Sequence, residues 1–223
     1  MILSVCPNPS VDCTIELDTL KTGSLNRVEN KVITYSGKAL NVAVGVARLG
    51  GDSFATGFMF DDNGKMFVHA LDDEGVKNTF VWNKGGARTN YKIVDKRSMM
   101  TEINDKGEPV AEKEQEELLD LVGTLSQQAS VVVMSGSLPS GVGDDYYLRL
   151  SERIPKNVKK IFDVTGDRLV NALKGGAYLV KPNLDELKEV TGEHYDGYDE
   201  MLGGCRRLLD AGAENILLSL GRK

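Results

Sequence analysis

The sequence predicts an α/β protein with a mainly parallel sheet and helices on both faces. From residue 131 onward, short apolar runs of strand length alternate with stretches of helical composition. Strands that alternate with helices form parallel β-α units, and the helices then cover both sides of the sheet. The loops that follow the apolar runs contain Gly, Ser or Asn. Because ligands bind at the carboxyl ends of strands in such sheets, these loops together are candidates for a site.

The amino-terminal half is expected to be rich in strands. Its first strand is interrupted by Pro7 and Pro9, and the next two strands are expected to pair as antiparallel neighbours across a turn at residues 21–23. Small residues in the first helix allow a close approach to a sheet. The predicted strands are residues 2–6, 11–17, 26–35, 53–60, 77–82 and 88–94, and the predicted helices are residues 39–49 and 63–71.

The carboxyl-terminal half begins with a polar turn at residues 104–108 and a charged helix at residues 112–128 that carries one apolar stripe. The repeated strand, loop and helix order then follows. The predicted strands are residues 131–134, 159–162, 177–180 and 214–220, and the predicted helices are residues 145–153, 168–173, 184–190 and 199–209.

Composition limits the function classes. The chain has 223 residues and a formal net charge of −6, which argues against a general nucleic-acid or anionic-membrane surface. The longest apolar runs are strand-sized and the start lacks a basic signal-peptide region, so we expect a cytoplasmic protein that does not span a membrane. Cys6, Cys13 and Cys205 lack metal-ligand spacing, which indicates free thiols. His69 and His194 are too far apart to suggest a zinc site or a histidine triad.

The run Ser36-Gly37-Lys38-Ala39-Leu40-Asn41 lies between a predicted strand and a predicted helix. A turn of small residues at a helix N-terminus leaves backbone N–H groups that suit an anion. Lys38 adds a charge there, and Asn41 offers a donor and an acceptor one turn later. These features suit a phosphorylated polyol. The six residues alone favour the simpler interpretation, a capped helix with Ser36 as N-cap and Lys38 in solvent.

Residues 88–94 alternate, so a strand would present Arg88, Asn90 and Lys92 on one face. Such a face suits the lining of an anion site. The pattern alone slightly favours the solvated side of an antiparallel sheet. Asp12, taken alone, reads as a loop carboxylate in solvent.

Lys181-Pro182-Asn183 precedes a predicted helix, and Glu186 follows three residues after Asn183. This spacing is typical of a capping box. It also places an amide and a carboxylate at the carboxyl end of a strand, where they suit a hydrated Mg²⁺ ion and a nucleotide phosphate. The chain has neither a GxxxxGK[ST] P-loop nor a GxGxxG run opening a first β-α unit, which disfavours P-loop NTPases and dinucleotide dehydrogenases.

Taken together in order, the motifs resemble those of ribokinase-like carbohydrate kinases in the phosphofructokinase-B branch, over the whole chain. The similarity is greatest to 1-phosphofructokinase and tagatose-6-phosphate kinase. The motifs are Asn8-Pro9-Ser10-Val11-Asp12, Gly23-Ser24-Leu25-Asn26-Arg27, Ser36-Gly37-Lys38-Ala39-Leu40-Asn41, Arg88-Thr89-Asn90, Ser135-Gly136-Ser137-Leu138-Pro139, Lys181-Pro182-Asn183 with Glu186, and Ser219-Leu220-Gly221. The family usually has Gly where this chain has Ser36 and Ala39, which leaves the sugar open.

The resemblance implies a single ribokinase-like domain over residues 1–223, three-layered α/β/α, with a small β lid near residues 11–17, 26–35 and 88–103. It also implies transfer of a phosphoryl group from ATP, with Mg²⁺, to a sugar phosphate. The preferred case is fructose 1-phosphate going to fructose 1,6-bisphosphate, and the lid is a possible homodimer contact. Such a lid excludes water from the reaction.

The same resemblance assigns roles to individual residues. By this resemblance, Asp12 and Asn41 bind the sugar hydroxyls. The loop at Gly37, Lys38 and Arg88 bind the phosphate already on the sugar. Asn90 lies nearby, and Arg27 is a further candidate contact for the same phosphate. The residues assigned to the nucleotide are Lys181, Asn183, Ser219 and Gly221. Glu186 is assigned to the metal, which it contacts through water.

The family's catalytic aspartate lies in a Gly-Ala-Gly-Asp loop that follows the segment matching residues 214–221. Lys223 is the last residue given, and Asp144 and Asp167 come too early in the strand order to replace that aspartate. We therefore expect a fragment that is inactive alone, in a reaction that depends on positioning and electrostatics. The alternatives are tagatose-6-phosphate kinase, a non-catalytic sugar-phosphate-binding protein, and a kinase for an unphosphorylated sugar or nucleoside.

Overall fold

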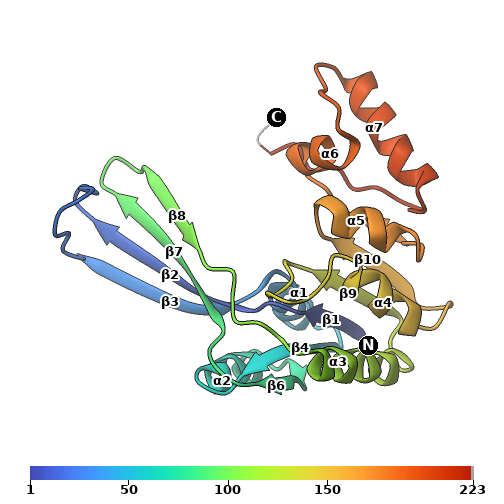
Figure 1. Cartoon of the computed structure of the whole chain (residues 1–223), viewed down its shortest axis with the longest axis horizontal. Helices are drawn as coiled ribbons and strands as arrows, with labels where there is room; N and C mark the ends of the chain where they lie inside the picture. Colours follow the sequence, from blue (N-terminus) through green and yellow to red (C-terminus); the bar gives the residue numbers. More distant parts are fainter. Residues whose placement is uncertain (222–223) are drawn as a thin grey trace.

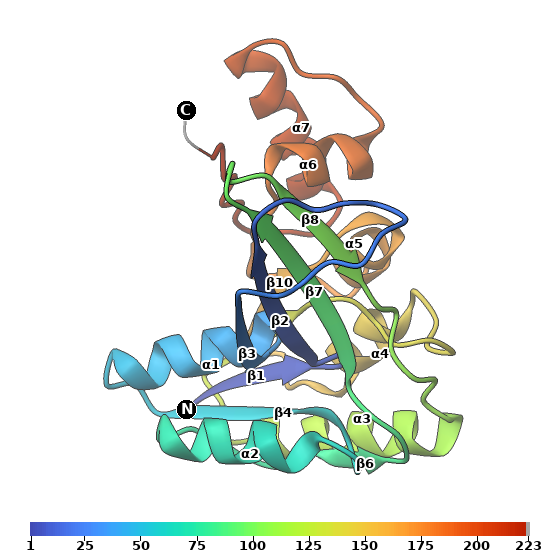
Figure 2. The same cartoon turned by 90° about the vertical axis from the view of Figure 1, so that its left-hand side faces the viewer.

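The computed structural model describes residues 1–221 and contains two sheets. One is the centre of an α/β body, and the other is a four-stranded lid that stands away from one side of that body (Figure 1). Figure 2, in which the lid faces the viewer, shows α6 and α7 at the far end of the body from α2. The predicted α/β class with a separate β lid is confirmed.

The central sheet is parallel at every pairing between its named strands, in the order β11-β10-β9-β1-β4-β5, with β6 also on β4. Its middle strands are apolar and buried, as expected for strands covered on both faces. Their bounds are β1 Ile2–Cys6, β4 Ser53–Phe60, β5 Lys77–Asn78, β6 Val81–Asn83, β9 Val131–Ser135, β10 Lys159–Asp163 and β11 Leu179–Val180.

The helices pack around this sheet, and both α1 and α3 contact β1 and β4. Among residues 1–221, no helix has the length and apolar character needed to cross a bilayer. The helix bounds are α1 Lys38–Arg48, α2 Gly64–Asp73, α3 Glu112–Ser126, α4 Tyr146–Arg153, α5 Gly166–Leu173, α6 Leu184–Thr191 and α7 Tyr198–Asp210.

The lid has the strand order β3-β2-β7-β8, in which β2 (Ser10–Leu17) pairs antiparallel with β3 (Asn30–Ser36) as predicted. The strand expected at 26–35 begins only at residue 30. The lid segment expected at 88–103 is two antiparallel strands, β7 (Arg88–Asp95) and β8 (Met100–Asn104). Asp95 stabilises the turn between them, because its Oδ1 accepts hydrogen bonds from the backbone N–H groups of Arg97 and Met99.

Two expected strands of the body are different in the structure. Residues 77–82 divide into β5 and β6, which pair with successive parts of β4. Residues 214–220 form isolated parallel bridges, Val180 to Ile216 and Asn183 to Ser219, instead of a continuous strand. An apolar pattern shows that a segment is extended, but it does not show where its partner strand breaks.

Candidate functional site

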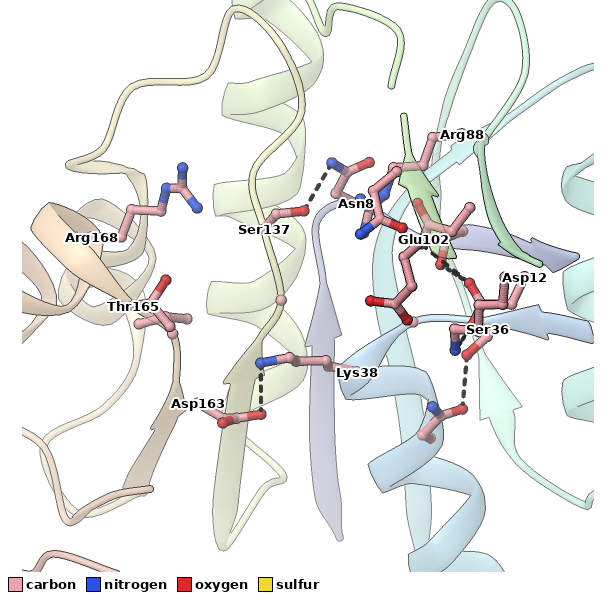
Figure 3. A pocket seen from close by; sticks show the side chains of 18 of the residues that line it. Asn8, Asp12, Ser36, Lys38, Arg88, Glu102, Ser137, Asp163, Thr165 and Arg168 are labelled. Carbon is pink, nitrogen blue, oxygen red and sulfur yellow. Dashed lines mark hydrogen bonds and ion pairs between the residues drawn. The ribbon is translucent and has the colours of Figure 1, made fainter. Parts of the chain in front are cut away.

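A cavity of about 540 Å³ lies where the lid meets the carboxyl ends of β9 and β10 and the first turn of α1 (Figure 3). Its walls are polar and carry both charge signs. The lining residues are Asn8, Ser10, Asp12, Ser36, Gly37, Lys38, Asn41, Arg88, Asn90, Lys92, Glu102, Asn104, Gly136, Ser137, Asp163, Val164, Thr165, Arg168 and Glu186. Most of the predicted substrate residues therefore surround one cavity.

Strand register builds the lid wall. Asp12 pairs with Asn90 across β2 and β7, and Asn90 pairs with Asn104 across β7 and β8, so the three side chains share one face. Asn90 Nδ2 donates to Asp12 Oδ1 over 3.2 Å, and Ser10 Oγ donates to the same oxygen over 3.0 Å. Lys92 Nζ lies 3.8 Å from Asp12 Oδ2. The Asp12 carboxylate is thus held in a fixed orientation at the cavity wall.

The first turn of α1 differs from the predicted cap. The N-cap is Gly37, without a side-chain capping bond, and Ser36 Oγ instead lies 3.3 Å from Asn41 Oδ1. A Cβ on Gly37 would lie 2.6 Å from Cys6 Sγ. Glycine is therefore required here by close approach, and Ser36 helps to orient Asn41 toward the cavity wall.

The Cys6 thiol is buried beside the start of α1. Burial raises the pKa of the Cys6 thiol to about 11, although the nearby backbone N–H groups of Leu40, Asn8 and Ala39 favour the thiolate. Cys6 therefore stays protonated near neutral pH. The expectation that helix N–H groups suit an anion here stays a prediction, and the side chains of Lys38 and Arg88 add positive charge at the cavity.

Lys38 lies between two carboxylates while its side chain is 52% exposed, so it is both solvated and loosely paired. Its Nζ is 3.8 Å from Asp163 Oδ2 and 3.8 Å from Glu186 Oε1 (Figure 3). Asp163 also accepts a hydrogen bond from Ser135 Oγ over 2.9 Å and lies 3.4 Å from Lys181 Nζ. Charged groups of alternating sign thus line the carboxyl ends of the central strands.

Arg88 lines the same cavity from the lid, with its guanidinium half-buried. Its Nη1 donates to the backbone carbonyl of Asp105 over 3.2 Å, and Nε has no hydrogen-bond partner among residues 1–221. Burial lowers the pKa of Arg88, while Cys6, Asp12 and Asp105 oppose that shift. Figure 3 shows Arg88 and Lys38 on different sides of the shared hollow.

Five predicted residues are not among those that line this cavity. Arg27, in the loop between β2 and β3, lines a separate hollow near the tip of the lid. Asn183 and Glu186 form the predicted capping box of α6. The other three lie beside the site: Lys181 contacts Asp163, Ser219 Oγ lies 3.5 Å from the carbonyl of Pro182, and Gly221 follows in the same segment.

Several cavity residues were not predicted, chiefly Asn8, Glu102, Asp163 and Arg168. Glu102 lies opposite Lys92 in the lid register, and the alternation of residues 100–104 contains that signal once the hairpin is known. Asp163 ends β10, so it belongs to the set of strand ends already named as candidates. Asn8 belongs to the first of the motifs, although only Asp12 of that motif was given a role. No local pattern marks Arg168, because its position depends on the packing of distant loops.

The donor set fits a hydrated Mg²⁺ ion better than a tightly caged metal. No group of three or more His, Cys, Asp or Glu side chains suited to a metal occurs in residues 1–221. Asp163 and Glu186 instead provide two carboxylates on either side of Lys38. Mg²⁺ is commonly held by one or two carboxylates together with waters and substrate phosphates.

Comparisons with known proteins agree with this geometry. The family model described as pfkB family carbohydrate kinase matches residues 8–223. A 1-phosphofructokinase of Borreliella burgdorferi is 34% identical over 221 residues, which are 99% of this chain and 71% of that protein.

Solved structures show the same fold. The tetrameric inhibited form of phosphofructokinase-2 from Escherichia coli superposes with a TM-score of 0.90 at 27% identity, over 99% of this chain and 73% of that one. Ribokinase of Arabidopsis thaliana, complexed with ribose and ATP, gives a TM-score of 0.79 at 20% identity, over 100% and 72%. At that lower identity the likeness concerns the ribokinase-like fold alone.

Proposed function

The chain belongs to the pfkB family of carbohydrate kinases, and from that premise we propose that its cavity binds fructose 1-phosphate for phosphorylation by ATP to fructose 1,6-bisphosphate. Relatives named 1-phosphofructokinase support a sugar-phosphate kinase. The observation that supports the proposal is the single cavity that Lys38 and Arg88 share with Asp12 and Asn41. A phosphate group binds to cationic side chains such as Lys38 and Arg88. The hydroxyl groups of a polyol donate hydrogen bonds to amide and carboxylate oxygens such as those of Asn41 and Asp12.

The roles within the cavity follow from its walls. Arg88 and Lys38 bind the phosphate already on the sugar, and a fork-shaped guanidinium suits a phosphate. Asp12 and Asn41 bind the sugar hydroxyls, and Asn90 orients Asp12. In the reaction a sugar hydroxyl oxygen bonds to the γ-phosphorus of ATP, the bond from that phosphorus to ADP breaks, and the hydroxyl proton is released. Arg27 lies outside this set.

The nucleotide is proposed to bind beside Lys181, Asn183, Ser219 and Gly221, next to the carboxylates at the strand ends. Glu186, through water, and Asp163 would hold Mg²⁺, which neutralises phosphate charge when it is bound. Lys38 and Lys181 both contact Asp163, so the two lysines are already close to the region where the phosphates would meet.

The 223 residues contain no Gly-Ala-Gly-Asp run, and we propose that substrate binding, not turnover, is the activity of these residues alone. An ADP-release assay with fructose 1-phosphate and ATP tests this directly. No ADP release above the rate without sugar is expected. Sugar-dependent ADP release from residues 1–223 would contradict the proposal that the absent loop is needed.

The lid is also proposed as a homodimer contact, because Val32, Ile33, Tyr91 and Ile103 leave apolar surface exposed on it. The three free thiols suit the cytoplasm as the compartment. Sedimentation at several protein concentrations tests the dimer, and a monomer at all concentrations would refute it.

Calorimetric titration tests which sugar phosphate the cavity binds. We expect binding of fructose 1-phosphate, weaker binding of tagatose 6-phosphate, and Arg88→Ala to lose about 2–4 kcal/mol of binding free energy for the phosphate ester. Neutral fructose should bind wild type and Arg88→Ala equally. Arg153→Ala is the matched control, since Arg153 pairs with Glu116 and Asp120 away from the cavity. If wild type binds neither sugar phosphate, the proposed function is wrong.

A further inference from the structure

Asn8 lies where the chain passes from the body into the lid, directly after β1. It is 3% exposed and also lines the cavity. Its Nδ2 donates to the backbone carbonyl of Lys106 over 3.2 Å and to Ser137 Oγ over 3.2 Å (Figure 3). Lys106 belongs to the segment that returns from β8 to the body, and Ser137 to the loop after β9. One buried amide therefore joins three segments that meet at the cavity.

The other half of this amide has no partner. Among residues 1–221, Asn8 Oδ1 is a buried acceptor without a donor, and Arg88 Nε is a buried donor without an acceptor. Buried polar groups are rarely left unpaired, so each of these atoms needs a reason. The two atoms are complementary in hydrogen-bonding character, and both belong to the cavity lining.

Gly107 shows that the two side chains are near each other. A Cβ on Gly107 would lie 2.9 Å from Asn8 Oδ1 and 3.7 Å from Arg88 Cδ, so one small space borders both. Gly107 has φ of 89°, a conformation that favours glycine, and its missing side chain leaves this space open. Nε is bonded to Cδ, so it lies beside the same space as Asn8 Oδ1.

We propose that Asn8 is a positioning residue for Arg88: its Oδ1 accepts a hydrogen bond from Arg88 Nε when the Nη atoms engage the phosphate of the sugar. This role presupposes the sugar-phosphate site proposed above. The guanidinium is planar, so fixing Nε also fixes the direction of both Nη groups. The same amide also holds the Lys106 segment and the Ser137 loop, so it would fix the position of Arg88 relative to the body as well as to the lid.

A double-mutant cycle tests the role, with the dissociation constant for fructose 1-phosphate as the readout. Asn8→Ala is expected to raise this constant about tenfold. Arg88→Lys keeps the charge but removes Nε, so adding Asn8→Ala to it should raise the constant less than threefold further. An equal fold change in both backgrounds would overturn the role, because a merely structural loss adds independently.

Asn83→Ala is the matched control. Asn83 is also buried and donates from Nδ2 to two backbone carbonyls, those of Met59 and Val81, outside the cavity. It should lower the urea midpoint as Asn8→Ala does while leaving the dissociation constant unchanged. If Asn83→Ala weakens binding as much as Asn8→Ala, the effect is one of stability and the role is refuted.

Asn8→Asp covers the case in which Asn8→Ala does not fold. Aspartate keeps the shape and the acceptor facing Arg88, loses both Nδ2 donations and adds a negative charge. Wild type and variant are therefore compared at high salt, which screens repulsion of the phosphate by that charge. The dissociation constant should stay within about threefold of wild type, and a tenfold or larger rise would show that only the donated bonds matter. Failure of wild type to bind the sugar phosphate refutes the proposed function, whereas additive losses in a binding-competent protein refute only the role of Asn8.

Discussion

Gly37→Ala is the substitution whose cost the structure defines most sharply. The new Cβ would lie 2.6 Å from Cys6 Sγ, whereas its next neighbours, Leu40 Cγ and Pro9 Cα, are at an ordinary 3.5 Å. The thiol has little room to move aside, because Cys6 is only 1% exposed. The first turn of α1 must therefore shift by about 1 Å to restore normal contact distances of roughly 3.5–4.0 Å.

Two opposing contributions determine how much Gly37→Ala changes the free energy of unfolding. Overpacking of this kind costs about 1–3 kcal/mol. Replacing Gly with Ala also restricts the unfolded chain, which returns about 0.4–1 kcal/mol where the backbone is compatible. With φ of 160°, Gly37 has extended backbone, so the compatible case applies. Gly37→Ala should thus lower the free energy of unfolding by about 1–2 kcal/mol.

Urea unfolding of four proteins measures this cost. They are wild type, Gly37→Ala, Cys6→Ala and the double variant. Without Sγ the new methyl group meets nothing closer than 3.5 Å, so Gly37→Ala should be nearly neutral in the Cys6→Ala background. An equal loss of stability in both backgrounds would refute the assignment of the glycine to close approach of the thiol.

Two further predictions concern the same region. Gly45→Ala, inside α1 with nothing within 4 Å of the new Cβ, should raise the free energy of unfolding by about 0.5–1 kcal/mol in urea titrations, and a loss would mean that the helix packs differently. The pKa of Cys6 is raised from 9.0 to about 11, so between these pH values the unfolded state binds fewer protons and stability falls as pH rises. Wild type should lose about 2 kcal/mol more than Cys6→Ala between pH 9 and pH 11, and parallel curves would contradict the buried thiol.

The lid face could be predicted because its information is local. A period of two places Arg88, Asn90 and Lys92 on one side of a strand whatever its neighbours are, and the structure puts all three on the cavity wall. The order of strands and helices fixed the class of the body for the same reason. The pairing of β2 with β3 was predicted from a turn at residues 21–23 between two β-forming runs, and it holds although the connection, residues 18–29, is longer than expected.

The remaining features depend on contacts between distant residues. Cys6 lies more than thirty positions before Gly37, and no pattern in either segment reveals that the thiol packs against the start of α1. Asn8 is 98 residues from Lys106 and 129 from Ser137, its hydrogen-bond partners. Helix and strand periodicities describe one segment at a time, so they cannot predict hydrogen bonds between residues this far apart in the sequence.

The position of Lys38 explains why a site of nearly balanced charge can still favour a phosphate. Two carboxylates hold the ammonium at 3.8 Å on either side, longer than a direct hydrogen bond, while its side chain is still 52% exposed. Such loose pairs in solvent contribute little, about 0–1 kcal/mol each. A phosphate that also contacts Arg88 gains stronger charge-assisted bonds, so it displaces these pairs at small cost. The carboxylates therefore hold Lys38 at the cavity without competing strongly for it, and high salt should weaken sugar-phosphate binding more than it weakens the fold.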